Sequence, residues 1–63
     1  MAELIDQYMI AEGKKEMLFQ DEETGLFTRA IMQLEEIEIT KEQWDNLKEE
    51  YKKSTPDSFV QLS

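Results

Sequence analysis

Residues 41–53 show the clearest pattern of apolar and polar positions in the chain. Trp44, Leu47 and Tyr51 stand at i, i+3 and i+7, which places all three on one side of an α-helix. Pro56 follows shortly afterwards, and proline disfavours helical geometry in the residue before it. The pattern therefore predicts a helix over residues 41–53 that buries one narrow apolar stripe.

Both ends of this predicted helix carry residues that stabilise helix termini. Thr40 and Gln43 have the spacing of a capping box, in which each side chain accepts a hydrogen bond from the backbone amide of the other residue. Glu42 lies in the first turn, and Lys52 and Lys53 lie in the last, which matches the helix dipole. We therefore expect the helix to start directly after Thr40.

Two apolar runs upstream flank a polar segment and predict a β-hairpin. The first run covers residues 16–20, the polar segment 21–25 ends in Gly25, and the second run begins at Leu26. A polar segment that ends in glycine between two apolar runs is typical of a hairpin loop. We therefore predict two antiparallel strands, at residues 16–20 and 26–39.

The second predicted strand, residues 26–39, alternates with a change of parity. Its first half is mainly apolar at even-numbered positions, whereas Ile37 and Ile39 are the apolar residues further on. One extra residue, a β-bulge, would keep Leu34 and Ile37 on the same side of the sheet. The alternative is a helix over residues 26–37, whose apolar positions also fit a period near 3.6.

The two ends of the chain are open to different interpretations. Residues 57–62 contain aromatic and β-branched residues in partial alternation, which is typical of an edge strand, although a frayed tail fits as well. Residues 3–12 carry a helical stripe of apolar residues, but Gly13 and Lys14 would also serve as a turn between two strands.

Together these elements predict a single α+β domain over residues 1–63. A small antiparallel sheet, built from the hairpin 16–20/26–39 and a C-terminal edge strand, packs with one helix over residues 41–53. The alternative fold is an all-α bundle of three helices.

Charge is the next feature that changes the picture. The chain has 15 acidic and seven basic side chains, a formal net charge of −8 and an isoelectric point near 4.3. This charge repels nucleic acid and anionic lipid and attracts basic protein surfaces. Hydrophobic residues make up 40% of the chain, which favours a folded protein over a disordered one. We therefore expect a protein partner with a basic surface, and neither direct nucleic-acid binding nor membrane binding.

Cysteine and histidine are both absent from the sequence. Disulfides are therefore impossible, zinc lacks its commonest ligands, and the usual general base and most reactive nucleophile of enzymes are missing. A calcium-binding loop that starts at Asp21 would need glycine and glutamate where the chain has Leu26 and Met32. We expect no enzymatic activity, no cofactor and no metal site.

The N-terminal residues and the chain length predict location and oligomeric state. Residues 1–6 carry acids where a signal peptide would be basic, and no segment is long and apolar enough to span a bilayer. We therefore expect a cytoplasmic protein. A core built from so few residues rarely supplies more than about 3–5 kcal/mol of stability, so association into a homodimer is expected to add to it.

The acidic residues are ordered around the start of the predicted helix. Three precede it, and three lie at i, i+3 and i+7 within it: Glu35, Glu36, Glu38, Glu42, Asp45 and Glu49. The ordinary interpretation of such charges is a solvated surface. The functional interpretation is a row of carboxylates that imitates DNA phosphates and binds the DNA-contacting surface of a protein.

Trp44 also has two interpretations. As the first residue of the helical stripe, it is expected in the core. As an aromatic residue beside Asp45 and among other acids, it also fits the hot spot of a binding interface.

Three passages resemble a family, the small acidic uracil-DNA glycosylase inhibitors carried by certain phages. MLFQDE at residues 17–22, with Gly25, is similar to the family's first strand and acidic turn. IEIT leading to WDNL, within residues 37–47, is similar to the start of its helix, and DSFVQL at residues 57–62 to its closing strand. The resemblance implies homodimers that occupy the DNA-binding cleft of the glycosylase, with Trp44 and Asp45 at the place of the family's aromatic–acid pair. The chain departs from the family in its additional N-terminal segment and in its longer second strand and helix.

The sequence therefore predicts an acidic DNA mimic that inhibits a DNA-processing enzyme, with uracil-DNA glycosylase as the first candidate, in the cytoplasm of a host cell if phage-encoded. The alternative is an acidic adaptor or regulatory protein that binds a non-DNA-binding protein through the Trp44 helix.

Overall fold

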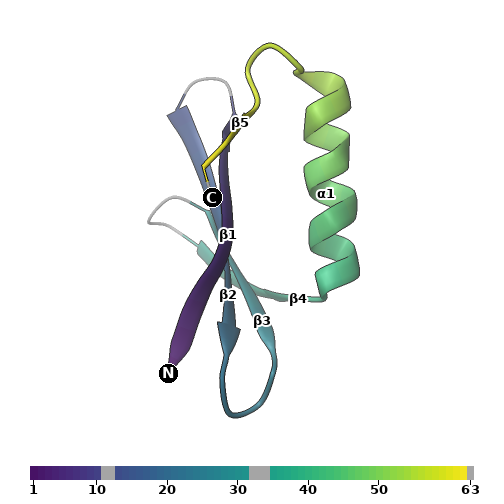
Figure 1. Ribbon diagram of the computed structural model, residues 1–63. Helices are drawn as coiled ribbons and strands as arrows, with labels where there is room; N and C mark the ends of the chain where they lie inside the picture. Colours follow the sequence, from purple (N-terminus) through teal and green to yellow (C-terminus); the bar gives the residue numbers. More distant parts are fainter. Residues whose placement is uncertain (11–12, 32–34, 63) are drawn as a thin grey trace.

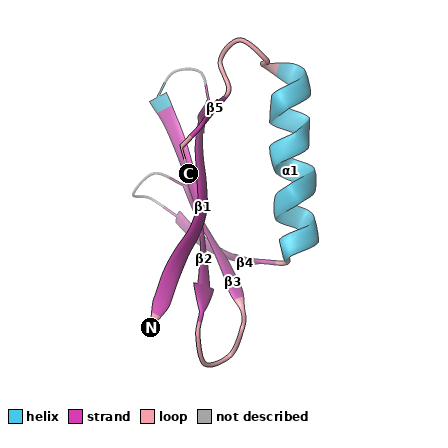
Figure 2. Ribbon diagram, viewed as in Figure 1, coloured by secondary structure: helices cyan, strands magenta, loops and turns pink. Residues whose placement is uncertain are grey.

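A computed structural model describes residues 1–10, 13–31 and 35–62. In these ranges the chain forms a five-stranded antiparallel sheet with one helix on one side of it (Figures 1 and 2). In chain order the elements are β1 (Ala2–Ile10), β2 (Lys14–Asp21), β3 (Phe27–Ile31), β4 (Glu35–Ile39), α1 (Lys41–Ser54) and β5 (Val60–Gln61). The spatial order is β4-β3-β2-β1-β5. The predicted α+β class is confirmed, and the three-helix alternative is wrong.

The segment predicted as one strand over residues 26–39 forms two strands. β3 pairs with β2, as the hairpin prediction requires, and β4 then runs back along the other side of β3 with Ile37 opposite Arg29. The change of parity attributed to a β-bulge instead marks a new strand, because each strand sets its own alternation. The proposed placement of Leu34 lies outside the described residues. The helical alternative over residues 26–37 is wrong.

Ala2–Ile10 form the long strand β1, so of the two interpretations left open for this segment the strand is correct and the helix is wrong. β1 pairs with β2, and the register skips Ile5, so that Leu4 lies opposite Phe19 and Asp6 opposite Leu18. This irregularity breaks the two-residue alternation of the strand. It explains why the apolar positions of β1 imitate a helical stripe in the sequence. The predicted C-terminal edge strand is confirmed, since β5 pairs with the outer side of β1.

The predicted capping box at the start of α1 is confirmed. The amide of Gln43 donates to the Thr40 hydroxyl at 3.1 Å, and the amide of Thr40 donates to the Gln43 side-chain oxygen at 3.1 Å. At the other end the Thr55 hydroxyl and amide both donate to the carbonyl of Tyr51. The helix ends at Ser54, one residue beyond the predicted end and two before Pro56.

The core lies between α1 and the sheet and is centred on Tyr8. The rings of Trp44 and Phe59 lie 5.2 and 5.0 Å from the Tyr8 ring, and the ring of Tyr51 lies 5.9 Å away. Leu18 of β2 completes the fully buried cluster with Tyr8 and Trp44. Aromatic contacts of this kind contribute beyond the area that they bury, so Tyr8 is a main contact of β1 with α1 and with Phe59, the residue before β5.

Candidate protein-binding surfaces

Most of the basic side chains contact partners within the chain. Arg29 lies 2.6 Å from Glu16, Lys48 lies 3.0 Å from Asp6, and Lys41 lies 2.7 Å from Asp45. Two further lysines lie over aromatic rings, Lys14 at 5.9 Å from the centroid of Tyr51 and Lys52 at 5.6 Å from that of Phe59. Five of the seven cations are therefore engaged internally.

The acidic side chains are distributed in the opposite way. Within the described ranges, ten of them are exposed and make no ion pair: Glu3, Glu22, Glu23, Glu35, Glu36, Glu38, Glu42, Glu49, Glu50 and Asp57. Only three carboxylates have ionic partners there, and two of those, Asp6 and Glu16, are largely or fully buried. The surface is consequently more one-sided in charge than the composition alone indicates.

The predicted row of acids is divided by the fold. Glu36 and Glu38 alternate with Glu35 along β4, so they point to opposite faces of the sheet. Ile39 of β4 packs against the core beside the helix, which places Glu35 on the helix side and Glu36 and Glu38 on the other.

The three predicted acids of α1 are all exposed, as predicted for a surface role. Glu42 and Glu49 make no ion pair among the described residues, whereas Asp45 is paired with Lys41. This pair is exposed on both sides, and exposed i,i+4 pairs contribute only about 0.3–0.5 kcal/mol. Asp45 therefore remains available to a partner that offers a stronger cation.

Trp44 is a core residue, which confirms the ordinary interpretation and overturns its assignment as a partner-contacting anchor. Its side chain is fully buried, and its indole N–H donates to Asp6 Oδ2 at 2.9 Å. Removing it from the core to reach a partner would leave that hydrogen bond and the Tyr8 contact unmade. The hot-spot prediction failed because a helical stripe shows which side of a helix is apolar but not what covers it.

Asp6 connects three elements and was missed by sequence analysis. Its Oδ2 accepts from Trp44 and Lys48 of α1, and its Oδ1 accepts from Gln61 of β5 and from the amide of Gln7. Burial by itself raises the pKa of Asp6, but the hydrogen bonds from Trp44, Lys48 and Gln61 outweigh it and hold the pKa below its ordinary value. No sequence signal joins residues 38 to 55 positions apart.

A second buried carboxylate, that of Glu16, lies under the helix. It is fully buried and accepts from Arg29 Nε, and this hydrogen bond raises the pKa of Arg29. Burial, followed by the charge of Glu16, raises the pKa of the adjacent Tyr8 hydroxyl. In the described ranges, Tyr8 Oη and Glu16 Oε2 are the two buried side-chain atoms without a hydrogen-bond partner. Both are sealed from solvent, so this cluster offers no binding site.

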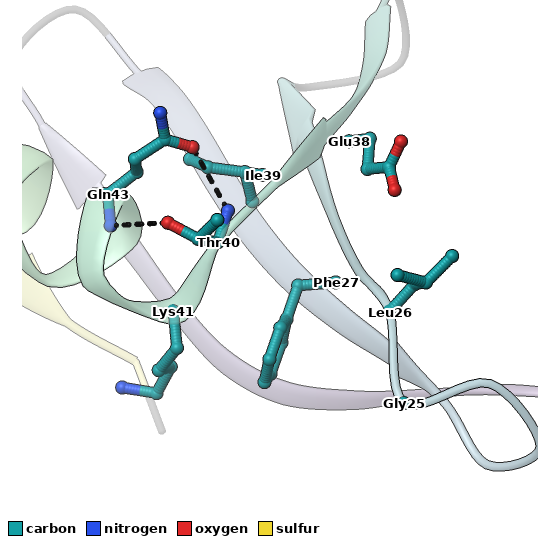
Figure 3. Close-up of a pocket in the computed structure, with 8 residues that line it drawn as sticks. All are labelled: Gly25, Leu26, Phe27, Glu38, Ile39, Thr40, Lys41 and Gln43. Carbon is teal, nitrogen blue, oxygen red and sulfur yellow. Dashed lines mark hydrogen bonds between the residues drawn. The ribbon is translucent and has the colours of Figure 1, made fainter.

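A surface pocket of about 410 Å³ lies where β3, β4 and α1 meet. Figure 3 shows the eight residues that line it: Gly25, Leu26, Phe27, Glu38, Ile39, Thr40, Lys41 and Gln43. The reciprocal hydrogen bonds of Thr40 and Gln43 close the helix N-terminus beside it, so the amide of Gln43 is not available to an anion. The walls are largely apolar, with Leu26 54% exposed, and Glu38 and Lys41 supply opposite charges.

The face of the sheet that points away from α1 forms a further surface. Tyr8 contacts the helix, so its neighbours in β1 point to the opposite side, together with the residues that pair with them. This open face carries an apolar centre of Leu4, Met9, Met17, Phe19, Ala30, Val60 and Leu62. Leu4, Val60 and Leu62 are among the exposed large apolar residues. Such a face was not predicted, because it depends on the pairing of β1 with β2, and the sequence leaves residues 3–12 open between a helix and a strand.

Neither a family model, a curated protein nor a solved structure matches the chain. The resemblance to uracil-DNA glycosylase inhibitors stays a prediction. In the described part of the chain, no helix has the length and apolarity needed to cross a membrane, and no cluster of three or more potential metal-ligating side chains is present.

Proposed function

We propose that the protein is a non-enzymatic, cytoplasmic inhibitor that occupies the DNA-contacting surface of a DNA-processing enzyme, with uracil-DNA glycosylase as the first candidate. The observation that carries this proposal is the separation of charge: five of the seven cations are engaged within the chain, while ten exposed carboxylates in the described ranges have no ionic partner there. Such a surface presents fixed negative charge to a partner, as a phosphate backbone does.

Two groups of carboxylates are suited to this contact. Glu36 and Glu38 stand two residues apart on one side of the edge strand β4, which separates them by about 6.6 Å. Glu42, Asp45 and Glu49 follow one another along the exposed side of α1. Because the strand leads directly into the helix through Thr40, a basic surface that contacts β4 lies close to the first turn of α1.

Apolar contacts in this proposal come from side chains other than Trp44. Leu26 is 54% exposed and lines the same pocket as Glu38. Ile37 is 42% exposed, but it lies on the helix side of β4, opposite to Glu36 and Glu38. A few buried anchors carry most of the binding energy of a typical interface, while charges at its rim act mainly on the association rate. We therefore assign the anchoring role to Leu26 and the steering role to the carboxylates.

Binding kinetics with a purified uracil-DNA glycosylase test this proposal. The double variant Glu36→Gln/Glu38→Gln is expected to slow association several-fold at low salt, because electrostatic steering acts mainly on the association rate. The matched control is Glu50→Gln/Asp57→Asn, which removes the same charge near the C-terminal end of α1 and is expected to change the rate far less. Leu26→Ala is expected to speed dissociation.

Equal slowing by the two double variants would mean that net charge, and not the β4 surface, governs association. Tight binding that duplex DNA does not displace would favour the adaptor alternative, in which the partner surface is not a DNA site. With Trp44 buried, that adaptor would use another surface than the one first expected.

A further inference from the structure

The open face of the central strand β2 has an ordered sequence of charge and apolar side chains. Along this face stand Lys15, Met17, Phe19 and Asp21, so a cation and an anion lie at opposite ends of two apolar residues. The pattern is self-complementary when a second copy is turned end for end. We propose that a second copy of this chain covers the open face through a two-fold axis that crosses β2 between Met17 and Phe19.

The register of the sheet determines which side chains then meet. Met17 lies over the partner's Phe19, and Lys15 lies over the partner's Asp21, each contact occurring twice by symmetry. Lys15 has no ionic partner within the described residues. Hydrogen bonds from the amides of Thr24 and Glu23 to Asp21 Oδ1 hold the pKa of Asp21 below its ordinary value, and its side chain makes no ion pair within the described residues.

The size of the open face fits a weak dimer. Five strands at a spacing of about 4.8 Å span about 19 Å, and an eight-residue strand spans about 26 Å. The projected face is therefore on the order of 500 Å² per copy, near the lower limit of specific interfaces at about 600 Å² per partner. Two sheets packed face to face with their strands nearly aligned are a standard arrangement for apolar sheet faces.

Like charges at the rim of the same interface limit its strength. Glu36 lies beside Ala30, and Glu38 lies beside Thr28, so the two-fold axis places Glu36 over the partner's Glu38. Each copy also carries a net charge of −8. Added salt screens this repulsion and also weakens the two contacts between Lys15 and Asp21, whereas the Met17 and Phe19 contacts are insensitive to it. Because each copy carries a net charge of −8, the loss of repulsion is the larger effect, and the dimer becomes stronger as salt is raised.

The dimer covers Glu36 and Glu38, so it competes with the proposed binding to an enzyme surface, which uses the monomer. The salt dependence distinguishes the two associations. Binding to a basic enzyme surface weakens with salt, and self-association strengthens. Either one can therefore fail while the other stands.

Sedimentation equilibrium over a range from micromolar to hundreds of micromolar, at low and high salt, tests the interface. The wild-type protein is expected to shift from monomer to dimer within this range and to do so at lower concentration in high salt. Met17→Lys is expected to raise the dissociation constant more than tenfold, because two lysines enter the centre of the interface. Lys15→Glu is expected to raise the dissociation constant several-fold. The double variant Lys15→Glu/Asp21→Asn is expected to recover part of the lost affinity, and its asparagine keeps an oxygen for the turn amides.

Lys53→Glu is the matched control, since it changes the charge equally on the exposed last turn of α1, and it is expected to leave the dimer nearly unchanged. Circular dichroism of each variant confirms that the monomer is folded. A wild-type protein that remains monomeric at hundreds of micromolar would overturn the proposal. A dimer that is equally sensitive to Lys15→Glu and Lys53→Glu, or insensitive to Met17→Lys, would show that another surface forms it.

Discussion

Replacing Asp6 by asparagine tests the connection between β1, α1 and β5. Each carboxylate oxygen of Asp6 accepts two hydrogen bonds, Oδ2 from Trp44 and Lys48 and Oδ1 from Gln61 and the amide of Gln7. Asparagine offers one acceptor oxygen and one amino group in the same places. Whichever way the amide is oriented, two of the four donors lose their acceptor.

The expected loss of stability is large for a chain of this size. Leaving a buried donor unsatisfied costs about 1–3 kcal/mol. The side chains of Asp6 and Lys48 are only 15% and 19% exposed, so water restores only part of the lost bonding. We expect Asp6→Asn to lower the free energy of unfolding by about 2–4 kcal/mol. The free energy of unfolding of the whole domain is expected to be only about 3–5 kcal/mol.

Urea unfolding near neutral pH, followed by the fluorescence of the single tryptophan, measures this loss. Asp45→Asn is the matched control, because Asp45 also pairs with a lysine but its side chain is 58% exposed. The Asp45→Asn variant is expected to lose no more than about 0.5 kcal/mol of unfolding free energy. Equal losses of stability in the two variants would refute the inference that Asp6 stabilises the fold because it is buried and accepts hydrogen bonds from several donors.

Acidification provides an independent check on the same residue. Because the folded protein holds the pKa of Asp6 below the ordinary value of 3.8, its contribution is fully present above that value. It is lost as the pH falls through the folded pKa. The difference in stability between the wild-type protein and Asp6→Asn is therefore expected to narrow as the pH is lowered from neutral to below 3.8. A difference that stays constant over this range would contradict the assignment.

Three further changes test other parts of the structure. Trp44→Ala is expected to lower the free energy of unfolding by about 3–5 kcal/mol, because it leaves a cavity in the core beside Tyr8, and circular dichroism would show the protein unfolded. A variant that stays folded and loses only partner binding would restore the anchor interpretation. Gly25→Ala is expected to lower the free energy of unfolding by about 1 kcal/mol, because φ at Gly25 is +76°. No atom lies within 4 Å of an added Cβ, so the cost comes from the backbone conformation alone. An unchanged midpoint of urea unfolding would contradict this. Arg29→Leu is expected to lower the free energy of unfolding by about 3–5 kcal/mol, because it leaves the buried Glu16 carboxylate without its cation. Thermal unfolding of the double variant Arg29→Leu/Glu16→Leu is expected to show that much of this stability is recovered. No recovery would show that packing, and not charge, explains the loss in the single variant.

Local signals in the sequence were sufficient for the helix and the first hairpin. The capping box at Thr40 and Gln43 and the polar turn ending at Gly25 involve residues within a few positions of one another, and both are confirmed. The reversal of the chain between β3 and β4 was missed. The change in alternation at Ile37 fits either a β-bulge within one strand or the start of a new strand, and only the pairing of Ile37 with Arg29 distinguishes the two.

Long-range contacts account for the remaining errors. The sequence leaves the first strand open between helix and strand, because the register irregularity at Ile5 disturbs the alternation, and its pairing with β2 is what selects the strand. Trp44 was assigned to a partner surface in one interpretation because Tyr8 and Asp6, which cover it, lie 36 and 38 positions earlier in the chain. The exposed acids were identified correctly as exposed, but their division between the two faces of β4 depends on the sheet.

The most direct test of DNA mimicry is uracil excision by a purified uracil-DNA glycosylase, measured with and without this protein at increasing concentrations of uracil-containing duplex DNA. Occlusion of the DNA-contacting surface predicts inhibition that excess DNA overcomes, raising KM for DNA while leaving kcat unchanged. The Glu36→Gln/Glu38→Gln variant is expected to inhibit more weakly than Glu50→Gln/Asp57→Asn. Full excision activity at micromolar concentrations of this protein would contradict the assignment of the glycosylase as target, and inhibition that excess DNA does not relieve would contradict the mimicry itself.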